Sequence, residues 1–429
     1  MAGEMLDRLF MAGFHACIFS LTLTLAFAIT PAWCQSSASA VADDEDVTVT
    51  ENQVEANQVN TSTNEDPEAA RRVERGYSPS LLKGAFEYKF YGSVRLHVIN
   101  AFAAETDDSE IKLGDGASRV GVSGEWHVNE KWNLFGRLES GFDLLDSFTE
   151  KAQNDYGGDL IPRLHYLGLE SDFIYLKFGK SWSAYYQVAG VADRFSIFGG
   201  NATGIYNAGT DGGATGTGRA DNALQTRAYL DLGRWSGIKP FNLNLQYQNG
   251  EPIPKIPGAS YGSAYSFSAW LEAENDLGLG IAWHQSNING SERSEFVQAG
   301  ISGDARALAV AFKTYGDRWL VSLVYSRLEN IETTDQSRYF DGTGMELFAQ
   351  WQFRDRWWLT GGGNYLDPDD DDPDGGEYQI RYLVLGVRYT FDSFNRMLYA
   401  EWRNDQGTLV DGTGRGNEFT VGFRWDFGY

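Results

Sequence analysis

"FNLNLQYQN" (Phe241–Asn249) alternates apolar and amide side chains without interruption. Successive side chains on a β-strand point to opposite faces. An extended backbone therefore separates two sets of four residues: Phe241, Leu243, Leu245 and Tyr247 on one face, and Asn242, Asn244, Gln246 and Gln248 on the other. The stretch predicts a strand with one apolar and one polar face, and the fold depends on which face is inside.

The same two-residue period runs from Phe86 to the last stretch, "FTVGFRWDF" (Phe419–Phe427). Strand-like stretches are separated by connections that are in turn short and long. The short ones are 129–132, 171–173, 233–240, 275–278, 316–319, 354–357 and 392–396, and the long ones are 103–116, 144–162, 183–223, 250–263, 287–304, 330–343, 367–377 and 405–416. About sixteen strands, with short turns on one rim and long loops on the other, are typical of outer-membrane barrels. We therefore expect an all-β fold, a transmembrane antiparallel β-barrel.

This architecture decides which face is inside. In "SRVGVSGE" (Ser118–Glu125), Arg119 alternates with Val120 and Val122. The lumen of a barrel of this size is too wide for side chains to fill, so it holds water. The apolar face then meets lipid, and Arg119 points into the lumen.

Two other folds were weighed. A soluble β-sandwich or propeller leaves the alternating loop lengths unexplained, and no blade repeat is visible. A smaller membrane-barrel enzyme needs a nucleophile, a base and an acid, but His97, His127, His165 and His284 are scattered. We therefore expect a protein that is not an enzyme.

The N-terminus carries an apolar run, Cys17–Ile29, which we interpret as part of a signal peptide spanning residues 1–34, with cleavage as late as residue 42 also open. Both cysteines, Cys17 and Cys34, lie in this segment, so the exported protein would have no disulfide. Residues 35–84 are polar and acidic and are expected to form a largely disordered periplasmic extension. The barrel would then span residues 85–429.

Charge limits the partners. The net charge of −24 argues against binding to nucleic acid. The acidic run Asp367–Glu377 resembles the first half of an EF-hand, but Arg381 stands where a bidentate glutamate is required. We expect a hydrated loop there, with bridging of Mg²⁺ or Ca²⁺ to lipopolysaccharide as an alternative, and we expect no metal site and no cofactor.

Several motifs resemble the general, non-specific trimeric porins of Gram-negative outer membranes. They are "FYGSVRLH" (90–97), "SRVGVSGEWHVNEKWNLFGRLE" (118–139), "PRLHYLGLE" (162–170), "YLKFGKSW" (175–182), "VADRFSIFGGN" (191–201) and "GRADNALQTRAYLDL" (218–232). The resemblance implies a homotrimer in the outer membrane, in contact with lipid and lipopolysaccharide. It also implies passive diffusion of small hydrophilic solutes and inorganic ions through a lumen narrowed by the third long loop.

The resemblance further implies a constriction in which arginines face that loop. The arginine positions fall on Arg119, Arg163 and Arg219, with Arg95 on the same strand face as the remaining basic position, Ser93. The loop residues are Asp193, Arg194, Ile197, Phe198, Gly199, Gly200 and Asn201. Ile197 and Asn201 stand where the family has acids, so we expect weak anion preference. A substrate-selective channel for phosphate, a sugar or an organic acid, and a mainly structural or adhesive barrel, remain alternatives.

Overall fold

A computed structural model describes residues 86–103, 109–129, 131–145, 160–171, 174–230, 239, 241–273, 276–369, 375–391 and 394–428. The predicted signal peptide and periplasmic extension, and the centre of the acidic run at 370–374, lie outside these residues. No helix in the described part of the chain is long and apolar enough to cross a membrane.

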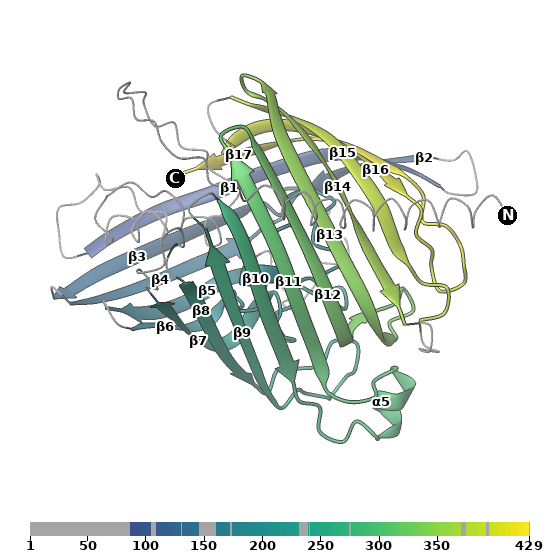
Figure 1. Cartoon of the computed structure of the whole chain (residues 1–429), viewed down its shortest axis with the longest axis horizontal. Coiled ribbons are helices and arrows are strands. Elements are labelled where there is room, and N and C mark those ends of the chain that lie inside the picture. Colours follow the sequence, from purple (N-terminus) through teal and green to yellow (C-terminus); the bar gives the residue numbers. More distant parts are fainter. Residues whose placement is uncertain are drawn as a thin grey trace, which may run out of the picture. The chain divides into compact units, whose positions relative to one another are not determined.

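The described residues form one antiparallel sheet with two short helices (Figure 1). The strands are β1 (Phe86–Phe102), β2 (Ser109–Asp115), β3 (Arg119–Asn129), β4 (Trp132–Gly141), β5 (Ile161–Glu170), β6 (Tyr175–Trp182), β7 (Arg219–Leu230), β8 (Phe241–Asn249), β9 (Ser263–Glu272), β10 (Leu277–Ser286), β11 (Ala305–Gly316), β12 (Trp319–Thr333), β13 (Tyr339–Arg354), β14 (Trp357–Pro368), β15 (Ile380–Thr390), β16 (Arg396–Asp405) and β17 (Glu418–Phe427). The helices are α4 (Tyr186–Ala189) and α5 (Ser294–Gln298).

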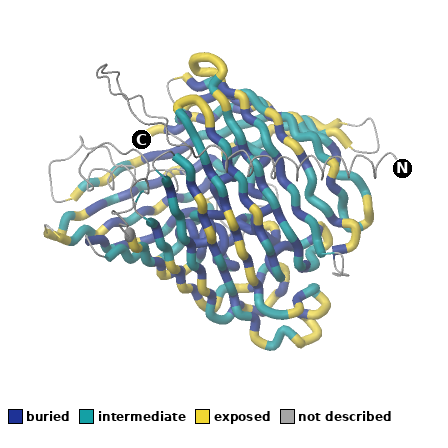
Figure 2. Tube along the Cα trace, in the orientation of Figure 1, coloured by how far each residue is buried: buried dark blue, intermediate teal, exposed yellow. Residues whose placement is uncertain are grey.

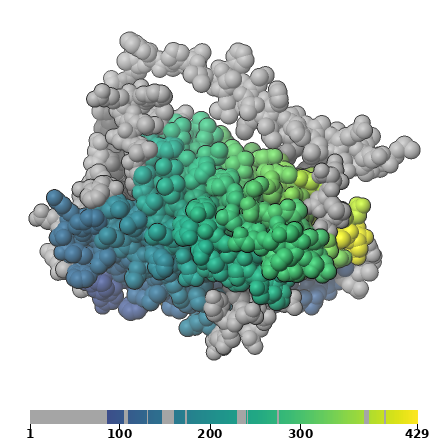
Figure 3. All heavy atoms as spheres, turned by 90° about the horizontal axis from the view of Figure 1, so that it is seen from below, coloured from purple at the N-terminus to yellow at the C-terminus, as the bar shows by residue number. Residues whose placement is uncertain are grey.

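The sheet closes on itself because β1 pairs with β17, from Gly92 opposite Phe427 to Ala101 opposite Glu418. The other side of β1 pairs with β3 along its first half and with β2 along its second half. β2 and β3 are therefore two halves of one strand, interrupted at residues 116–118, where Ala117 has a φ of 69°. The result is the expected closed barrel, of sixteen strands when β2 and β3 count as one, and neighbouring strands follow one another in chain order. The colours on the face shown in Figure 3 follow this order.

Burial alternates along the strands as the sequence predicts (Figure 2). Arg119 is 1% exposed, whereas its neighbour Val120 is 44% exposed on the outside of the barrel. On β8, Gln246 is buried and Leu245 is exposed. The apolar face is outside and the polar face is inside, as expected for a barrel whose outer wall meets lipid.

Two of the predicted long loops are wrong in extent. Half of the segment predicted as loop 103–116 is strand, because Ser109–Asp115 pairs with the second half of β1. Likewise only residues 334–338 separate β12 from β13, although 330–343 was predicted as loop. In both places polar, turn-rich sequence suggested a loop, but pairing with the neighbouring strand outweighs the local preference.

The connection between β6 and β7, residues 183–218, is called the third loop below. Its helix α4 contacts the inner faces of β9, β10, β11 and β12. Room for the helix comes from small side chains: Ala305, Ala307, Ala309 and Ala311 on β11 all point inward and are buried. The loop therefore occupies part of the lumen rather than projecting from the rim.

Candidate functional site

The third loop is fixed to the inner wall by carboxylates of distant strands. The backbone N–H groups of Ser196 and Ile197 donate to the two oxygens of Glu401 on β16, at 2.7 and 3.1 Å. The N–H of Gly200 donates to Glu346 Oε1 on β13 at 2.8 Å. The bonds to the carboxylate of Glu401, which also pairs with Arg388, are of the stronger, charge-assisted kind. These glutamates hold the loop tip against one side of the barrel.

Neutral side chains complete the attachment. The N–H of Asn201 donates to Asn364 Oδ1 at 3.1 Å, and Asn201 Nδ2 donates to the Tyr382 hydroxyl at 2.6 Å. The same hydroxyl donates to the carbonyl oxygen of Phe198 at 2.9 Å. Gly200 has a φ of 73°, a left-handed conformation that favours glycine at the turn between these contacts.

A cavity of about 1140 Å³ lies between the loop and the opposite wall. All but one of the predicted site residues line it: Arg95, Arg119, Arg163, Arg219, Asp193, Arg194, Ile197, Phe198, Gly199 and Asn201. The exception is Gly200, which is buried in the loop turn. Arg95, Arg119, Arg163 and Arg219, here called the basic wall, come from β1, β3, β5 and β7.

Two of the wall arginines share one acid that the sequence did not single out. Arg163 Nε lies 2.8 Å from Glu139 Oε1, and Arg119 Nη1 lies 3.9 Å from the same oxygen. The Tyr91 hydroxyl donates to the other oxygen of Glu139 at 3.0 Å. Glu139 on β4 is 1% exposed. A single buried carboxylate therefore holds two guanidinium groups in place, and one positive charge remains in excess.

Arg219 is positioned by aromatic rings and by the loop. Its guanidinium lies 4.7 Å from the centre of the Trp182 ring and 5.7 Å from that of Tyr206. Its Nη1 lies 3.5 Å from Asp211 Oδ2. Burial alone would raise the pKa of Asp211, but Lys180 and Arg219 outweigh it and hold this pKa below the usual value. Asp211 is therefore a permanent anion in this part of the loop.

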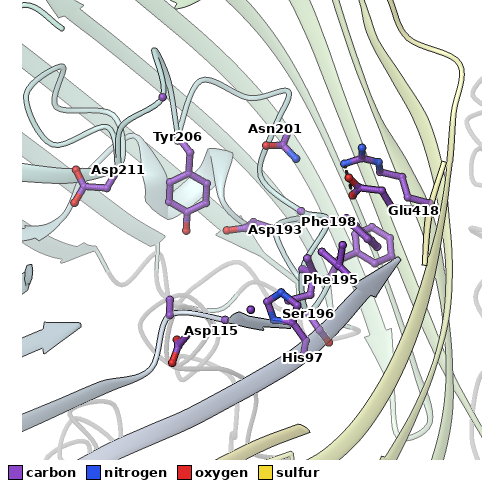
Figure 4. A pocket seen from close by; sticks show the side chains of 18 of the residues that line it. His97, Asp115, Asp193, Phe195, Ser196, Phe198, Asn201, Tyr206, Asp211 and Glu418 are labelled. Carbon is purple, nitrogen blue, oxygen red and sulfur yellow. Dashed lines mark ion pairs between the residues drawn. The ribbon is translucent and has the colours of Figure 1, made fainter. Parts of the chain in front are cut away.

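The Asp193 carboxyl group, unlike that of Asp211, has a raised pKa. The Tyr206 hydroxyl and the Asp193 carboxylate face one another at the edge of the cavity (Figure 4). Burial raises the pKa of Asp193 to about 6, although a hydrogen bond from Tyr206 and the charges of Arg219 and Arg194 act in the opposite direction. Burial also lowers the pKa of Arg194 to about 9, so this guanidinium is still charged at neutral pH.

Comparison with known proteins decides the family, since residues 36–428 match the model of the Gram-negative porins. The chain is a Gram-negative porin. It is similar to outer membrane porin PhoE of Enterobacter cloacae, with 22% identity over 329 residues, which cover 74% of this chain and 84% of the relative.

Solved structures show the same fold. Salmonella typhi OmpF in complex with daunomycin aligns with a TM-score of 0.65 at 18% identity, over 81% of this chain and 99% of its own. OmpT of Vibrio cholerae in its trimer form aligns with a TM-score of 0.54 at 19% identity. The alignment covers 80% of this chain and 100% of the OmpT chain. The predicted family and barrel are confirmed, and this porin is a diffusion pore of the outer membrane.

Much of the charge that faces the lumen of this porin lies outside the predicted site residues. Among the described residues that line the cavity, eleven are Arg or Lys and seven are Asp or Glu. The additional arginines come from the last strands and their loops: Arg388, Arg403, Arg415 and Arg424. Arg388 Nη2 lies 3.4 Å from Glu401 Oε1. Arg403 Nη1 lies 3.2 Å from Glu418 Oε2, and Figure 4 labels Glu418. Alternation along a strand gives the face on which Arg388 or Arg424 lies, but it does not show that this face meets the third loop.

Proposed function

We propose that the basic wall and the third loop give this porin a weak preference for anions. The observation that carries the proposal is the excess of cations over acids around the cavity, together with Ile197 and Asn201 on the loop. In a narrow passage between low-dielectric walls, fixed charges close to the ion dominate selectivity. Charges in the exposed loops are screened over about 8–10 Å at physiological salt and count for less.

The distribution of partners supports this proposal. Glu139 accepts contacts from both Arg119 and Arg163, so those three groups retain a net positive charge. Asp193 faces the same cavity but is neutralised as the pH falls toward its pKa of about 6. The negative charge of the third loop therefore neutralises only part of the positive charge of the basic wall.

The proposal is tested by reversal potentials of the purified protein in planar bilayers across a salt gradient. We expect weak anion selectivity for the wild type. Ile197→Glu restores an acid opposite the wall and Arg119→Ala removes a cation, so both should shift the reversal potential toward cations. Strong cation selectivity of the wild type at about 1 M salt, where the Debye length is about 3 Å, would contradict the proposal. Absence of any conductance would favour a structural or adhesive barrel.

We also propose that the porin assembles as a homotrimer, as the structure of Vibrio cholerae OmpT in its trimer form is described. The outer faces of β3, β4 and β5 expose Val120, Leu138 and Leu167, and these apolar surfaces would contact either lipid or a neighbouring subunit. Mass measurement of the detergent-solubilised protein tests the assembly, and a monomeric mass would contradict it.

A further inference from the structure

The arginines at the end of the barrel wall adjoin an apolar surface that the charge proposal does not use. Met397 on β16 lies directly opposite Arg424 on β17, and Arg424 lies directly opposite Arg95 on β1. Directly opposed residues of an antiparallel sheet point to the same face. All three line the cavity. A single row of the inner wall therefore changes from apolar to cationic across two strand spacings, or about 10 Å.

The apolar end of this row is broader than Met397 alone. Trp358, Phe394, Met397 and Tyr399 form a buried cluster on the inside of β14–β16, and Ile197 of the third loop packs against it. Ile197 is held there because its N–H donates to Glu401 at 3.1 Å. Ile197, Met397 and Tyr399 line the cavity. The loop thus extends the apolar surface toward the passage.

The cationic end carries one positive charge in excess. Arg424 Nε lies 2.8 Å from Asp426 Oδ2, and Asp426 also accepts from Ser93. Arg95 Nε donates to the Ser93 hydroxyl at 2.8 Å, while Arg95 Nη2 has no hydrogen-bond partner among the described residues. Two guanidinium groups and one carboxylate leave a net charge of plus one. This end matches a solute with a single negative charge.

From this arrangement we propose that the porin favours amphiphilic monoanions: organic acids with one carboxylate and an apolar ring or chain. The carboxylate would lie at Arg95 and Arg424, and the apolar body would lie against partly exposed Ile197 and the small edges of Met397 and Tyr399 that reach the cavity. An inorganic anion gains nothing from the apolar surface, whereas an apolar body gains by leaving water. The inference rests on the proposed anion preference and specifies the class of anion.

The experiment compares two acids of similar size as blockers of the chloride current. Cyclohexanecarboxylate has an apolar ring, and quinate has the same ring bearing hydroxyl groups. Both are added to single channels of the full-length protein in about 0.1 M KCl at neutral pH, where charges are screened over about 10 Å. We expect cyclohexanecarboxylate to block half of the current at a concentration about fivefold lower than quinate does. This ratio corresponds to the removal of roughly 40 Å² of the apolar ring surface from water.

Ile197→Gln and Met397→Gln should remove this difference by making the surface polar. Ile380→Gln is the matched control, because Ile380 lines the same cavity but begins β15, whereas Thr390, the partner of Met397, ends it. The two ends of this 11-residue strand are about 33 Å apart, so Ile380 lies far from Met397. Since Ile197 lies in the loop, its variant carries the test if Met397→Gln fails to insert.

Equal half-blocking concentrations for the two acids in the wild type would overturn the inference, as would a difference that survives Ile197→Gln. Reversal potentials in KCl gradients separate this result from the proposed function. An anion-selective channel with equal block by both acids sinks only the inference. A cation-selective channel that neither acid blocks sinks both.

Discussion

Asp193 gives the constriction a charge that depends on pH. Its pKa is raised to about 6, chiefly by burial, so the carboxylate is mostly ionised at pH 7 and mostly neutral at pH 5. Loss of this negative charge should increase anion preference as the pH falls through 6. Asp193→Asn should show the low-pH selectivity already at pH 7 and respond less to pH. Reversal potentials at pH 5 and pH 7 measure both effects.

Other groups face Asp193 or share its cavity, namely Tyr206, Arg194, Arg219, Glu346 and His97. Asp211→Asn is the matched control, because the pKa of Asp211 lies below its usual value and the group stays ionised throughout this window. That variant should shift the reversal potential equally at both pH values. If Asp193→Asn keeps the full pH response of the wild type, another of these groups is responsible.

At this scale the sequence predicted which side chains enter the lumen but not which ones meet. Strand alternation placed Arg119 and Gln246 inside, and both are buried there. The partners are set by contacts between segments far apart in the chain. Ser196 and Glu401 are separated by 205 residues, and no local pattern links them. Only the resemblance to known porins pointed to the loop.

Among the elements, the third loop depends on the two glutamates that bind its backbone. Glu401→Gln should keep the barrel intact and weaken the loop attachment, because it removes the charge that strengthens two hydrogen bonds and pairs with Arg388. Each such bond contributes about 1.5–3 kcal/mol. We expect greater open-channel noise and a changed single-channel conductance, with little change in the melting temperature of the barrel.

Glu418→Gln is the control for this variant. Glu418 also lines the cavity and pairs with an arginine, Arg403, at 3.2 Å. In the described contacts its carboxylate bonds to no backbone group of the third loop. Glu418→Gln should therefore leave the noise unchanged. Equal noise in the two variants would show that charge in the cavity, rather than attachment of the loop, controls the current.

The elements show where sequence patterns were insufficient. Residues 103–116 were predicted to form a loop, yet Gly114 lies within β2 opposite His97. A Cβ at this position would collide with the His97 ring, so the glycine makes space for a cross-strand neighbour. A glycine that ends a strand and a glycine that accommodates a side chain look the same in one sequence.

For the whole molecule, the expected independence of the barrel from residues 35–84 can be tested directly. In the described residues β1 pairs with β17 and closes the wall from Gly92 onward. A protein in which a signal peptide is joined to residue 84 should therefore insert and conduct like the full chain. Single-channel conductance and ion selectivity are the measurements. A changed conductance would mean that the acidic extension enters or gates the pore.

At this largest scale the sequence was most informative. Period-two alternation and the alternation of short and long connections require no knowledge of distant contacts. The polar and apolar faces of each strand follow from its own local sequence. These two patterns were sufficient to predict about sixteen strands in an antiparallel barrel, and the pairing of β1 with β17 confirms the barrel.

β11 departs from that alternation, and the departure is itself a signal. Inward-facing Ala307, Ala309 and Ala311 alternate with outward-facing Leu308 and Val310, so this part of the strand is apolar on both faces. A wall segment that faced channel water would not be built this way, since aliphatic side chains gain nothing from hydration. In another barrel sequence with alternating short and long connections, a strand segment that lacks a polar face would indicate the part of the lumen from which water is excluded. The strands against which an inserted loop packs could then be predicted from the amino-acid sequence alone.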